Sequence, residues 1–385
     1  MAFDLASTPV TGIQVQACGD AHVCNFGEFA TPERNVVFDI NDFDETIPGP
    51  WEWDVKRLCA SLHIVGRQQG LKPSAITKIV LSAVSEYREQ MNRYAQMPLL
   101  DLWYDRIHIR DVLDHFPKRY RGRVWRHVRR AYRKTHQRAA EKFMGGGEER
   151  RFLEAPPLLV RLENTGFDMA EVHSPIDNYR LSLSSERRFL FDQYELLDVA
   201  RKVVGVGSVG THCWIALFED LNDPDGTPLI LQVKEAQASV LEPFVGASFL
   251  DHNGERVVEG QRVTQAASDI FLGWTQGPRS GRQYYVRQLW DVKGQGDPLT
   301  MDPIGLSYYG ALCAWALARA HARTGDASQI AGYLGKSAVF DRAIADFSQR
   351  YAEVNERDHA QLSRAVARGK LELPSEDRPA GALLS

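Results

Sequence analysis

The chain has 385 residues, of which 44% are hydrophobic and 25% charged, and its formal net charge is −4 at pH 7. This length is sufficient for two domains or for one large domain with two lobes. Because the charge is nearly balanced, the whole protein has no strong electrostatic field. The net charge therefore does not require a nucleic acid or a membrane surface as the partner.

The expected compartment is the cytoplasm, with no membrane partner. No run of 18 apolar residues occurs, and residues 1–10 lack the basic start and apolar centre of a signal peptide. The five cysteines are scattered and odd in number, which favours reduced thiols over disulfides or a zinc site.

The first part of the chain predicts two short strands followed by two helices. Residues 13–17 (IQVQA) alternate in polarity and residues 35–40 (NVVFDI) are rich in β-branched and aromatic side chains, as is typical of strands. Residues 47–50 (IPGP) predict a turn. Apolar positions within residues 51–70 then recur at helical spacing, and a second helix is expected over residues 73–97.

Residues 116–142 are strongly basic, with eleven Lys or Arg residues opposed only by Glu141. The favoured interpretation is a helix over residues 118–142 whose charged face is solvated, so a nucleic acid partner is not expected. A patch that binds a phosphate-bearing substrate or nucleic acid is the alternative. The stretch MGGGEER at residues 144–150 predicts a flexible linker.

From about residue 196 the pattern changes from helical to strand-like. Residues 196–220 predict a strand, a glycine-rich turn and a second strand, and residues 229–236 (LILQVKEA) predict a third strand. A helix is expected over residues 256–268, a strand over residues 283–290, and helices from about residue 302 to residue 366.

The glycine-rich turn carries the pattern GxGxxG, formed by Gly205, Gly207 and Gly210 with Ser208 between them. In a dinucleotide-binding fold this loop opens a helix, whereas here the residues after it predict a strand. A strand–glycine loop–strand unit covers the nucleotide phosphates in protein kinases, and Lys234 has the place of the strand lysine that pairs with those phosphates. A plain hairpin with a surface lysine is the alternative.

A strand lysine of this kind needs a carboxylate on the adjoining helix to hold it in place. Glu242, Glu255 and Glu259 are the candidates, and Glu259 is favoured because it lies within the longest helical run. Each of the three is equally consistent with an exposed helix glutamate.

The N-terminal stretch CGDAHVCNFG supplies other parts of the same chemistry. Phosphoryl transfer needs a carboxylate that orients or deprotonates the attacking hydroxyl, a second ligand for Mg²⁺, and an aspartate that reaches the metal from the next strand. Asp20 and Asn25 have the kinase spacing for the first two, and the stretch NDFD after residues 35–40 supplies the third. Such oxygen ligands suit Mg²⁺ far better than Zn²⁺.

Several roles stay open within this acidic region. Asp42 and Asp44 are candidate metal ligands. Asp39 is a further candidate, because a carboxylate is not expected inside an apolar strand unless it has a specific role. The alternative is that these residues are ordinary turn aspartates. His22 is a candidate general base, although a packing or loop-bracing histidine is the favoured interpretation. Asp54, in the following helix, is expected to accept hydrogen bonds from the catalytic loop backbone.

Five stretches carry a family resemblance: GDAHVCNFGEF, VVFDINDFDETIPGPWEWDVKRLCASL, QVKEA, GERVVEGQRVTQAASDIFLGW and ALARAHARTGDA. Over nearly the whole chain they resemble the uncharacterised bacterial family known as domain of unknown function 2252 (DUF2252). That family is grouped with the protein kinase-like superfamily, near the aminoglycoside and choline phosphotransferases. Those relatives carry a His-Gly-Asp-x-x-x-x-Asn loop, an Ile-Asp-x-Gly-type metal aspartate and a Tyr-x-Asp on the next helix.

The resemblance implies specific roles for residues of this chain. Asp20 is implied as the catalytic aspartate and Asn25 as a metal ligand. Asp42 is implied as the second metal ligand, because its distance in sequence from Asp54 resembles the relatives' spacing, and Asp39 is its rival.

The chain also departs from these relatives. Cys18 stands where they have the loop histidine, and the glycine loop follows the catalytic loop by about 180 residues, whereas in a kinase it comes first. The expected fold is therefore circularly permuted, with residues 307–322 as the helix that leads into the catalytic loop. A circular permutation is tolerated where the joined ends of the chain lie close together. Family members usually carry an extra N-terminal segment; this chain is expected to lack it, which would leave surface uncovered or impair activity.

The sequence thus predicts an α+β, protein kinase-like fold with two lobes. Residues 1–190 are expected to form a helix-rich lobe with the catalytic and metal loops, residues 191–295 a β-rich nucleotide-binding lobe, and residues 296–385 helices that pack on the first lobe. The expected activity is transfer of phosphate from ATP, with Mg²⁺, to a small hydroxyl-bearing molecule. Transfer of AMP on the same fold and a non-catalytic kinase-like binding module are the alternatives.

Overall fold

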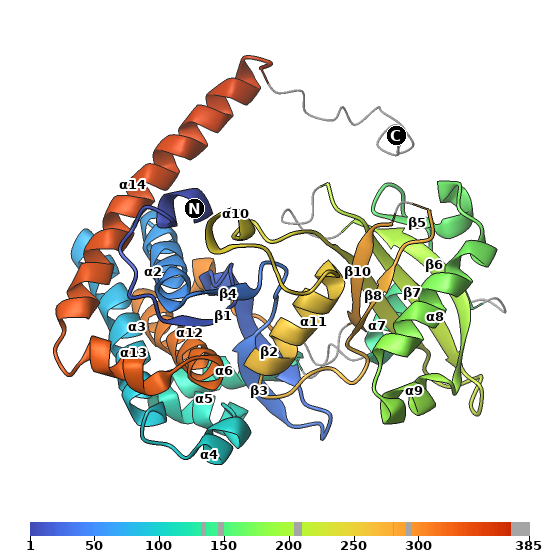
Figure 1. Cartoon of the computed structure of the whole chain (residues 1–385), viewed down its shortest axis with the longest axis horizontal. Helices are drawn as coiled ribbons and strands as arrows, with labels where there is room; N and C mark the ends of the chain where they lie inside the picture. Colours follow the sequence, from blue (N-terminus) through green and yellow to red (C-terminus); the bar gives the residue numbers. More distant parts are fainter. Residues whose placement is uncertain (132–135, 145–149, 204–209, 280, 290–293, 371–385) are drawn as a thin grey trace.

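The computed structural model describes residues 1–131, 136–144, 150–203, 210–279, 281–289 and 294–370. They form two lobes that lie side by side (Figure 1). One lobe is helical and is built from both ends of the chain, and the other surrounds a six-stranded sheet from its middle. The α+β class predicted from the sequence is confirmed. No described helix is long and apolar enough to cross a membrane.

The helical lobe is a bundle around one buried helix. Its helices are α1 (Ala2–Leu5), α2 (Trp51–Gln68), α3 (Pro73–Tyr94), α4 (Leu99–Tyr104), α5 (Ile109–His115), α6 (Lys118–Ala131), α12 (Pro303–Thr324), α13 (Ala327–Leu334) and α14 (Val339–Ala367). Helix α12 is alanine-rich and buried on nearly every side, which is the pattern of a helix at the centre of a core. Its small residues let α2 and α3 approach closely, and Gly310 lies directly against Leu62 of α2.

Two short antiparallel ladders lie beside this bundle: β1 (Gln14–Ala17) with β4 (Ile47–Pro50), and β2 (Phe26–Ala30) with β3 (Val36–Ile40). Strands β1 and β3 confirm two sequence predictions. The turn predicted over residues 47–50 was wrong, because these residues pair with β1 as a strand. Two prolines are tolerated there because each strand of a two-stranded ladder has a free edge, where no N–H needs a partner.

The sheet lobe is antiparallel, with the strand order β5–β6–β7–β8–β10–β9. The strands are β5 (Leu159–Arg161), β6 (Tyr194–Lys202), β7 (Cys213–Asp220), β8 (Leu229–Ala236), β9 (Gly273–Gln276) and β10 (Gln283–Gln288). The helices around it are α7 (His136–Phe143), α8 (His173–Ser182), α9 (Ser185–Phe191), α10 (Glu242–Val245) and α11 (Asn253–Thr264). Short 3₁₀ turns are η1 (Val23–Asn25), η2 (Leu162–Thr165), η3 (Met169–Val172) and η5 (Pro298–Thr300).

The two faces of the sheet pack against different helices. Successive side chains of a strand point to opposite faces. On one face Ile215 and Ile230 share a core with α7, and on the other Ala216 and Leu231 share a core with α8 and α9. The meander of β6, β7 and β8 therefore separates two distinct environments.

The lobe boundary differs from the one predicted at residue 190. Strand β5 pairs with β6 in the register Leu159↔Lys202, and Tyr179 and Phe191 belong to a core on the sheet. The sheet lobe therefore takes in α7, β5, α8 and α9, because their apolar side chains cover the sheet. The helices after residue 296 pack on α2 and α3.

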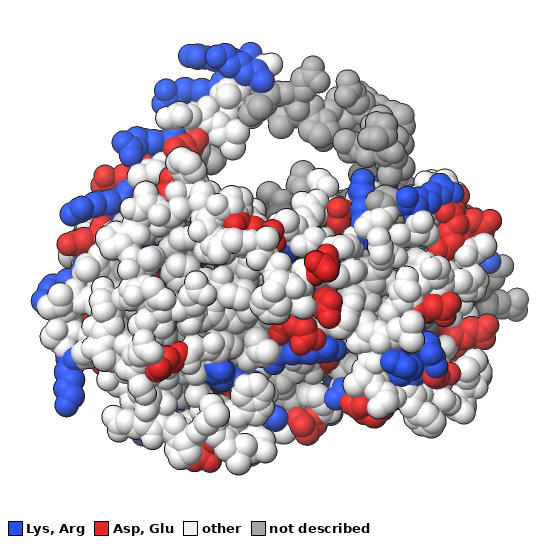
Figure 2. Space-filling model, in the orientation of Figure 1, with Lys and Arg blue, Asp and Glu red and all other residues white. Residues whose placement is uncertain are grey.

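In the basic segment the structure describes the helices α6 and α7 within the helix predicted over residues 118–142. Residues 132–135 between them, and residues 145–149 of the predicted linker, lie outside the described part. On α6, Val128 is buried whereas Arg126 and Arg129 are exposed, and Arg123 pairs with Asp302 at 3.2 Å. This is the arrangement of a solvated helix face above a buried seam. On the face drawn in Figure 2, charged side chains of both signs follow the projecting end of α14, and acidic ones gather near the junction of the lobes.

Candidate functional site

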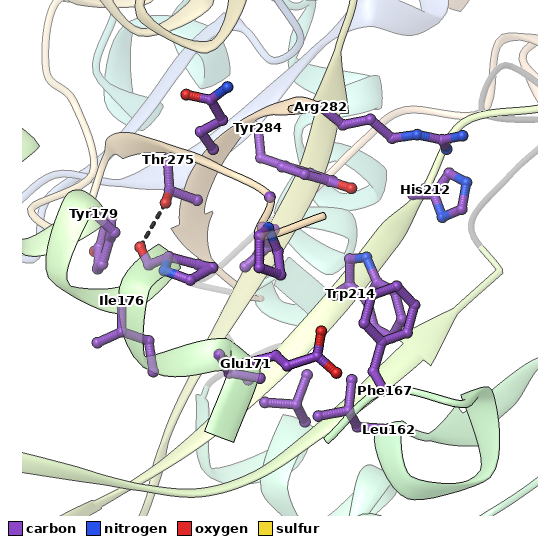
Figure 3. A pocket seen from close by; sticks show the side chains of 18 of the residues that line it. Leu162, Phe167, Glu171, Ile176, Tyr179, His212, Trp214, Thr275, Arg282 and Tyr284 are labelled. Atoms are coloured by element: carbon purple, nitrogen blue, oxygen red, sulfur yellow. Dashed lines mark hydrogen bonds between the residues drawn. The ribbon is translucent and has the colours of Figure 1, made fainter. Parts of the chain in front are cut away.

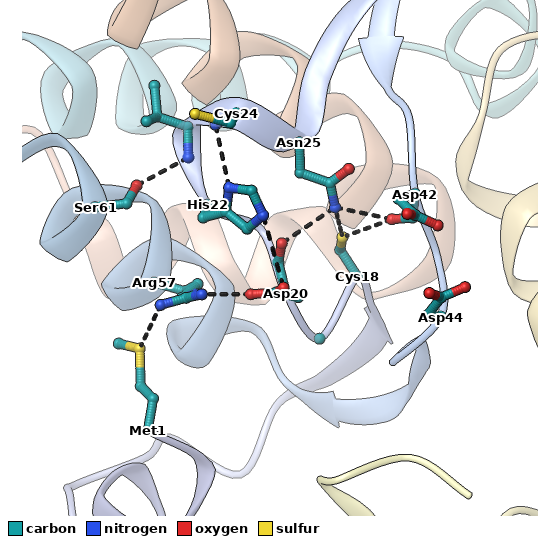
Figure 4. Close-up of polar contacts among 12 residues, drawn as sticks. Met1, Cys18, Asp20, His22, Cys24, Asn25, Asp42, Asp44, Arg57 and Ser61 are labelled. Carbon is teal, nitrogen blue, oxygen red and sulfur yellow. Dashed lines mark hydrogen bonds and ion pairs between the residues drawn. The ribbon is translucent and has the colours of Figure 1, made fainter. Parts of the chain in front are cut away.

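The loop between β1 and β2 carries Asp20 and Asn25 (Figure 4). Gly19, directly before Asp20, has φ +82°, and a side chain there would collide with the backbone of Glu45. Only glycine fits this left-handed position without strain. The glycine therefore lets the chain turn immediately in front of the candidate catalytic aspartate.

Asp54 of α2 holds this loop by its backbone. Its Oδ2 accepts the N–H of Cys18 at 2.7 Å, and its Oδ1 accepts the N–H of Gly19 at 3.0 Å. The same Oδ2 lies 3.1 Å from Nε2 of His321 on α12, whose Nδ1 lies 2.8 Å from the Tyr87 hydroxyl. The bracing role predicted for Asp54 is confirmed, whereas His321 was not predicted because it comes from the far end of the chain.

The Asp20 side chain is held by α2 yet remains open to solvent. Arg57 Nε donates to Asp20 Oδ1 at 2.7 Å, and Nε2 of His22 lies 3.7 Å from Oδ2. The Asp20 side chain is 43% exposed, so its carboxylate can be reached by a molecule from solution. Arg57 is a site residue that the sequence analysis missed.

His22 braces the loop. Its Nδ1 accepts the backbone N–H of Cys24 at 3.2 Å, which caps η1. Burial lowers the pKa of the imidazole below its ordinary value, despite the opposing effect of Asp20. The neutral ring therefore carries its proton on Nε2 and presents an N–H, not a lone pair, toward Asp20. This geometry favours the bracing interpretation of His22 over that of a general base.

Asn25 ties the Asp20 loop to the acidic stretch after β3. Its Nδ2 donates to the backbone carbonyl of Asp20 at 3.1 Å and to that of Asp42 at 2.9 Å. Because the amide nitrogen is used in this way, the amide oxygen Oδ1 is the atom left to face a cation. Asn25 is buried, so this orientation is fixed by the surrounding protein.

Lys234 reaches the acidic stretch from the sheet lobe. Its Nζ lies 3.3 Å from Asp42 Oδ2 and forms a closer ion pair with Asp44. Burial by itself would lower the pKa of Lys234, but Asp42 and Asp44 raise it above its ordinary value, so the side chain is an ammonium. Burial and the neighbouring Asp42 raise the pKa of Asp44 against the opposing effect of Lys234. The dense carboxylates are thus balanced by a basic side chain.

Strand β10 adds two polar side chains that the sequence analysis missed. Tyr285 is directly opposite Lys234 in the ladder, and its hydroxyl donates to Asp42 Oδ1 at 3.4 Å. Arg287 Nη1 donates to the carbonyl of Asn41 at 3.3 Å. Both residues follow from the alternation of QYYVRQ once the register with β8 is known, but the register itself is not visible in the sequence.

Asp39, the rival metal ligand, has a different role. Its Oδ2 pairs with Arg319 of α12 at 2.6 Å and accepts the N–H of Ala266 at 3.0 Å, while its Oδ1 accepts the N–H of Ile40 at 3.0 Å. Asp39 and Arg319 are 1% and 0% exposed. Both carboxylate oxygens are satisfied inside the protein, so the proposed metal role for Asp39 is corrected to a structural one.

Glu259, the expected partner of Lys234, pairs with Arg262 at 2.7 Å and is 42% exposed. The carboxylates that contact Lys234 come from the Asp42–Asp44 stretch instead. Helix α11 turns Arg256 toward that stretch, where its guanidinium donates to the carbonyl of Asp44 at 2.8 Å. Glu259 is therefore corrected to a surface residue, because its exposed carboxylate pairs with Arg262 of the same helix.

The glycine-rich turn is described only in part. Gly205, Gly207 and Ser208 lie outside the described residues. Gly210 is exposed, with φ +88°, and strand β7 begins three residues later at Cys213. The prediction that a strand follows the glycines is confirmed, which excludes the helix-opening loop of a dinucleotide-binding fold.

The oxygen atoms around Asp42 fit Mg²⁺ better than a metal that needs several protein ligands. Among the described residues, no three His, Cys, Asp or Glu side chains lie close enough together to hold a metal ion alone. Asp44 Oδ1 is buried, with no hydrogen-bond donor among those residues. Asp44, Asp42 and the Asn25 amide supply oxygen atoms, the type of donor that Mg²⁺ prefers, and Mg²⁺ usually keeps several waters beside one or two carboxylates.

Fold and site define an α+β protein in which an acidic loop of a helical lobe meets a lysine from an antiparallel sheet. The chain belongs to the family described as an uncharacterized protein conserved in bacteria (DUF2252), whose family model matches residues 1–365. This confirms the family resemblance found in the sequence. Searches of curated proteins and of solved structures found no significant match.

Proposed function

We propose that this protein is an ATP- and Mg²⁺-dependent phosphotransferase that acts on a small hydroxyl-bearing molecule. The observation that carries the proposal is the contact of Lys234 with Asp42, which joins the two lobes across 192 positions of the chain. A strand lysine beside the phosphates and an Asp and Asn that bind metal are the parts that kinases use for phosphoryl transfer.

The order of the strands supports a kinase-like arrangement. The glycine-rich turn lies between β6 and β7, Lys234 lies on the next strand, β8, and helix α11 follows. The kinase glycine loop and lysine follow one another in this way along the chain.

The position of α12 supports the permuted order. Its last residue, Thr324, accepts the N–H of Gln16 in β1 through its Oγ1 at 3.1 Å. The helix expected to lead into the catalytic loop therefore ends beside the strand that opens it, as a permuted chain requires.

Each group has a distinct task in this proposal. Asp20, half exposed, would orient or deprotonate the acceptor hydroxyl. Asn25 and Asp42 would hold Mg²⁺, with Asp44 as a further ligand, and bound Mg²⁺ would offset the negative charge of the phosphates. Lys234 now pairs with the carboxylates of Asp42 and Asp44. Bound Mg²⁺ would balance the charge of these carboxylates instead, so that Lys234 would pair with the phosphates.

Calorimetric titration of the full chain with MgATP tests the proposal. We expect binding by the wild type, and at least tenfold weaker binding by Asp42→Asn and by Lys234→Met. Asp20→Asn is expected to bind MgATP but to lose about 10²-fold or more in turnover, the usual contribution of a general base. The acceptor is sought in a pool of small alcohols, amino alcohols and sugars by mass spectrometry.

Matched controls are the same changes at exposed positions, Asp101→Asn on α4 and Lys78→Met on α3, which should bind MgATP like the wild type. Absence of MgATP binding by the wild type, or equal losses in the controls, would overturn the proposal. A product heavier by adenylate instead of phosphate would replace it with AMP transfer. Nucleic acid binding with a steep salt dependence and without turnover would replace it with a binding module.

A further inference from the structure

A cavity of about 470 Å³ lies in the sheet lobe, between the sheet and the segment from η2 to α8 (Figure 3). Strand β8 contributes Leu231 and Val233 to the lining of this cavity. Lys234, the next residue of the strand, points to the other face of the sheet. The sheet therefore separates the cavity from the candidate site at Asp42, which Lys234 contacts.

The two faces of the sheet differ in how tightly they are packed. On the face of Lys234, Ile215 and Ile230 are 0% exposed. On the cavity face, Trp214 and Val233 are only partly buried, although helices pack on this face as well. Protein interiors leave few voids larger than a water molecule, and a volume of this size is in the range of ligand pockets.

Most of the lining is apolar, and polar groups in it are used within the protein or uncharged. The Tyr179 hydroxyl donates to the carbonyl of Phe271 at 2.7 Å, and the Thr275 hydroxyl donates to the carbonyl of Pro175. Burial lowers the pKa of the His212 imidazole below its ordinary value, so this ring is neutral at pH 7. A ligand is therefore not needed to satisfy the two hydroxyls or to balance the imidazole.

The ionised side chains of the lining are Glu171, Arg279 and Arg282, and each is paired with an opposite charge. Arg279 forms a two-pronged ion pair with Glu171 and lies over the ring of Phe167, 4.7 Å from its centroid. Arg282 Nη1 lies 3.6 Å from the carboxylate of Glu235. The charges around the cavity thus balance one another without a ligand.

We propose that this cavity binds a small, uncharged, apolar molecule. A charged ligand would lose its water there, and the charged groups of the lining are already engaged with one another. An uncharged apolar molecule gains free energy when its surface leaves water, and dry apolar cavities bind such molecules. The same reasoning disfavours a nucleotide, so the site is separate from the proposed phosphotransferase site on the other face of β8.

Two fluorescent dyes test the proposal. N-phenyl-1-naphthylamine is uncharged, and 1-anilinonaphthalene-8-sulfonate has the same ring system with one added negative charge. Each dye is titrated into the full chain and its fluorescence is followed. We expect the dissociation constant of the uncharged dye to be at least tenfold lower.

Displacement of the bound uncharged dye separates charge from size. The competitors are 1-naphthylmethanol, 1-naphthoate and 1-naphthylmethylammonium, which share one ring system and differ in the charge of a small substituent. We expect the alcohol to displace the dye at a concentration at least tenfold lower than either ion does. Equal displacement by the alcohol and one of the ions would overturn the proposal.

Variants that fill the cavity locate the binding. Val233→Phe adds a ring from β8 and Ile176→Phe adds bulk from α8, so each should weaken the uncharged dye at least tenfold. The thermal midpoint should be maintained, because the added atoms occupy empty space. Val339→Phe, at an exposed position of α14, should bind the dye like the wild type.

If one filled variant fails to fold, the other still tests the site. Failure of both to fold would overturn the proposal, because a true cavity accepts the added atoms. Unchanged dye binding in a folded filled variant would overturn it as well.

Breaking an ion pair of the lining tests why the ligand is uncharged. Glu171→Gln leaves Arg279 without its carboxylate, so 1-naphthoate should gain and the preference for the alcohol over this anion should fall at least threefold. Glu353→Gln, at an exposed position of α14, should preserve the preference. An unchanged preference in Glu171→Gln would overturn the assignment to paired charges.

The nucleotide separates this proposal from the phosphotransferase proposal. MgATP should not displace N-phenyl-1-naphthylamine, whether or not MgATP binds elsewhere on the chain. Displacement by MgATP would overturn the inference, because the cavity would then belong to the nucleotide site.

Discussion

Asp39 and Asp42 are three positions apart in the sequence, and each forms an ion pair with a basic side chain. The two ion pairs differ in how far they are buried. In the closed pair, Asp39 and Arg319 are 2.6 Å apart and 1% and 0% exposed. In the open pair, Asp42 and Lys234 are 3.3 Å apart and 39% and 10% exposed. The closed pair is surrounded by protein, whereas the open pair leaves a carboxylate that solvent can reach.

The two ion pairs of this acidic stretch are expected to respond differently when one partner is lost. In the closed pair, loss of one partner leaves an uncompensated charge in the core. In the open pair, water and other cations can replace the lost partner, so the contact contributes little to stability. The closed pair joins β3 to α12, and the open pair leaves the Asp42 carboxylate within reach of solvent.

The largest effect is expected when the closed pair is broken. Arg319→Met leaves Asp39 buried without its cation, so the free energy of unfolding should fall by about 3–5 kcal/mol. Urea unfolding measures this change. Arg342→Met, at an exposed position of α14, should stay within about 0.5 kcal/mol of the wild type. A similar small loss for Arg319→Met would show that the pair is not structural.

A second closed carboxylate, Asp54, should give an intermediate loss. In Asp54→Asn one of the two oxygens that accept the N–H groups of Cys18 and Gly19 becomes an amide donor. Leaving one buried N–H without an acceptor should cost about 1–3 kcal/mol in urea unfolding. Asp101→Asn at an exposed position of α4 is the control, and equal behaviour of the two would contradict the bracing role.

The open pair should show the reverse pattern, with little loss of stability and a large loss of ligand response. Asp42→Asn should change the free energy of unfolding by less than about 1 kcal/mol, because Asp42 is well exposed. We expect MgATP to raise the thermal midpoint of the wild type, since a ligand stabilises the state that binds it, and this rise should be absent in the variant. Thermal scans with and without MgATP measure both. A persistent rise in the variant would separate Asp42 from the proposed site.

The smallest effect is expected in the pH dependence of stability at His22. Burial lowers the pKa of His22 in the folded protein, so its contribution is present above the unfolded pKa of about 6.5 and is lost as the pH falls below it. His22→Asn keeps a side-chain acceptor for the N–H of Cys24 and removes this titration. Unfolding at pH 7.5 and pH 5 should show a smaller loss on acidification in the variant. An equal loss would assign the acid sensitivity to other groups.

The local elements of the fold could be predicted, but the pairing between distant segments could not. Strands at residues 14–17 and 36–40 and the helices around Val55 and Pro73 follow from periodicity, which acts over a few residues. Strand β4 was missed because its two prolines indicate a turn, and only pairing with β1 makes it a strand. The boundary at residue 190 failed for the same reason, since β5 has three residues and is defined by its partner β6.

The candidate site shows the same division. The spacing of Asp20, Asn25 and Asp54 is local, and the structure brings these residues together. Asp39 looked like a metal ligand because its partner Arg319 lies 280 positions away. Glu259 was chosen by helix length, which carries no information about which side of α11 faces Lys234.

The position of α12 near the end of the chain has a consequence for synthesis on the ribosome. Asp39 and Asp54 leave the exit tunnel 280 and 267 residues before the side chains that contact them, Arg319 and His321. At 5–20 residues per second, this delay is roughly 15–55 s. The sheet lobe is more contiguous and can form during that interval, whereas the nascent helical lobe waits until α12 has been synthesised.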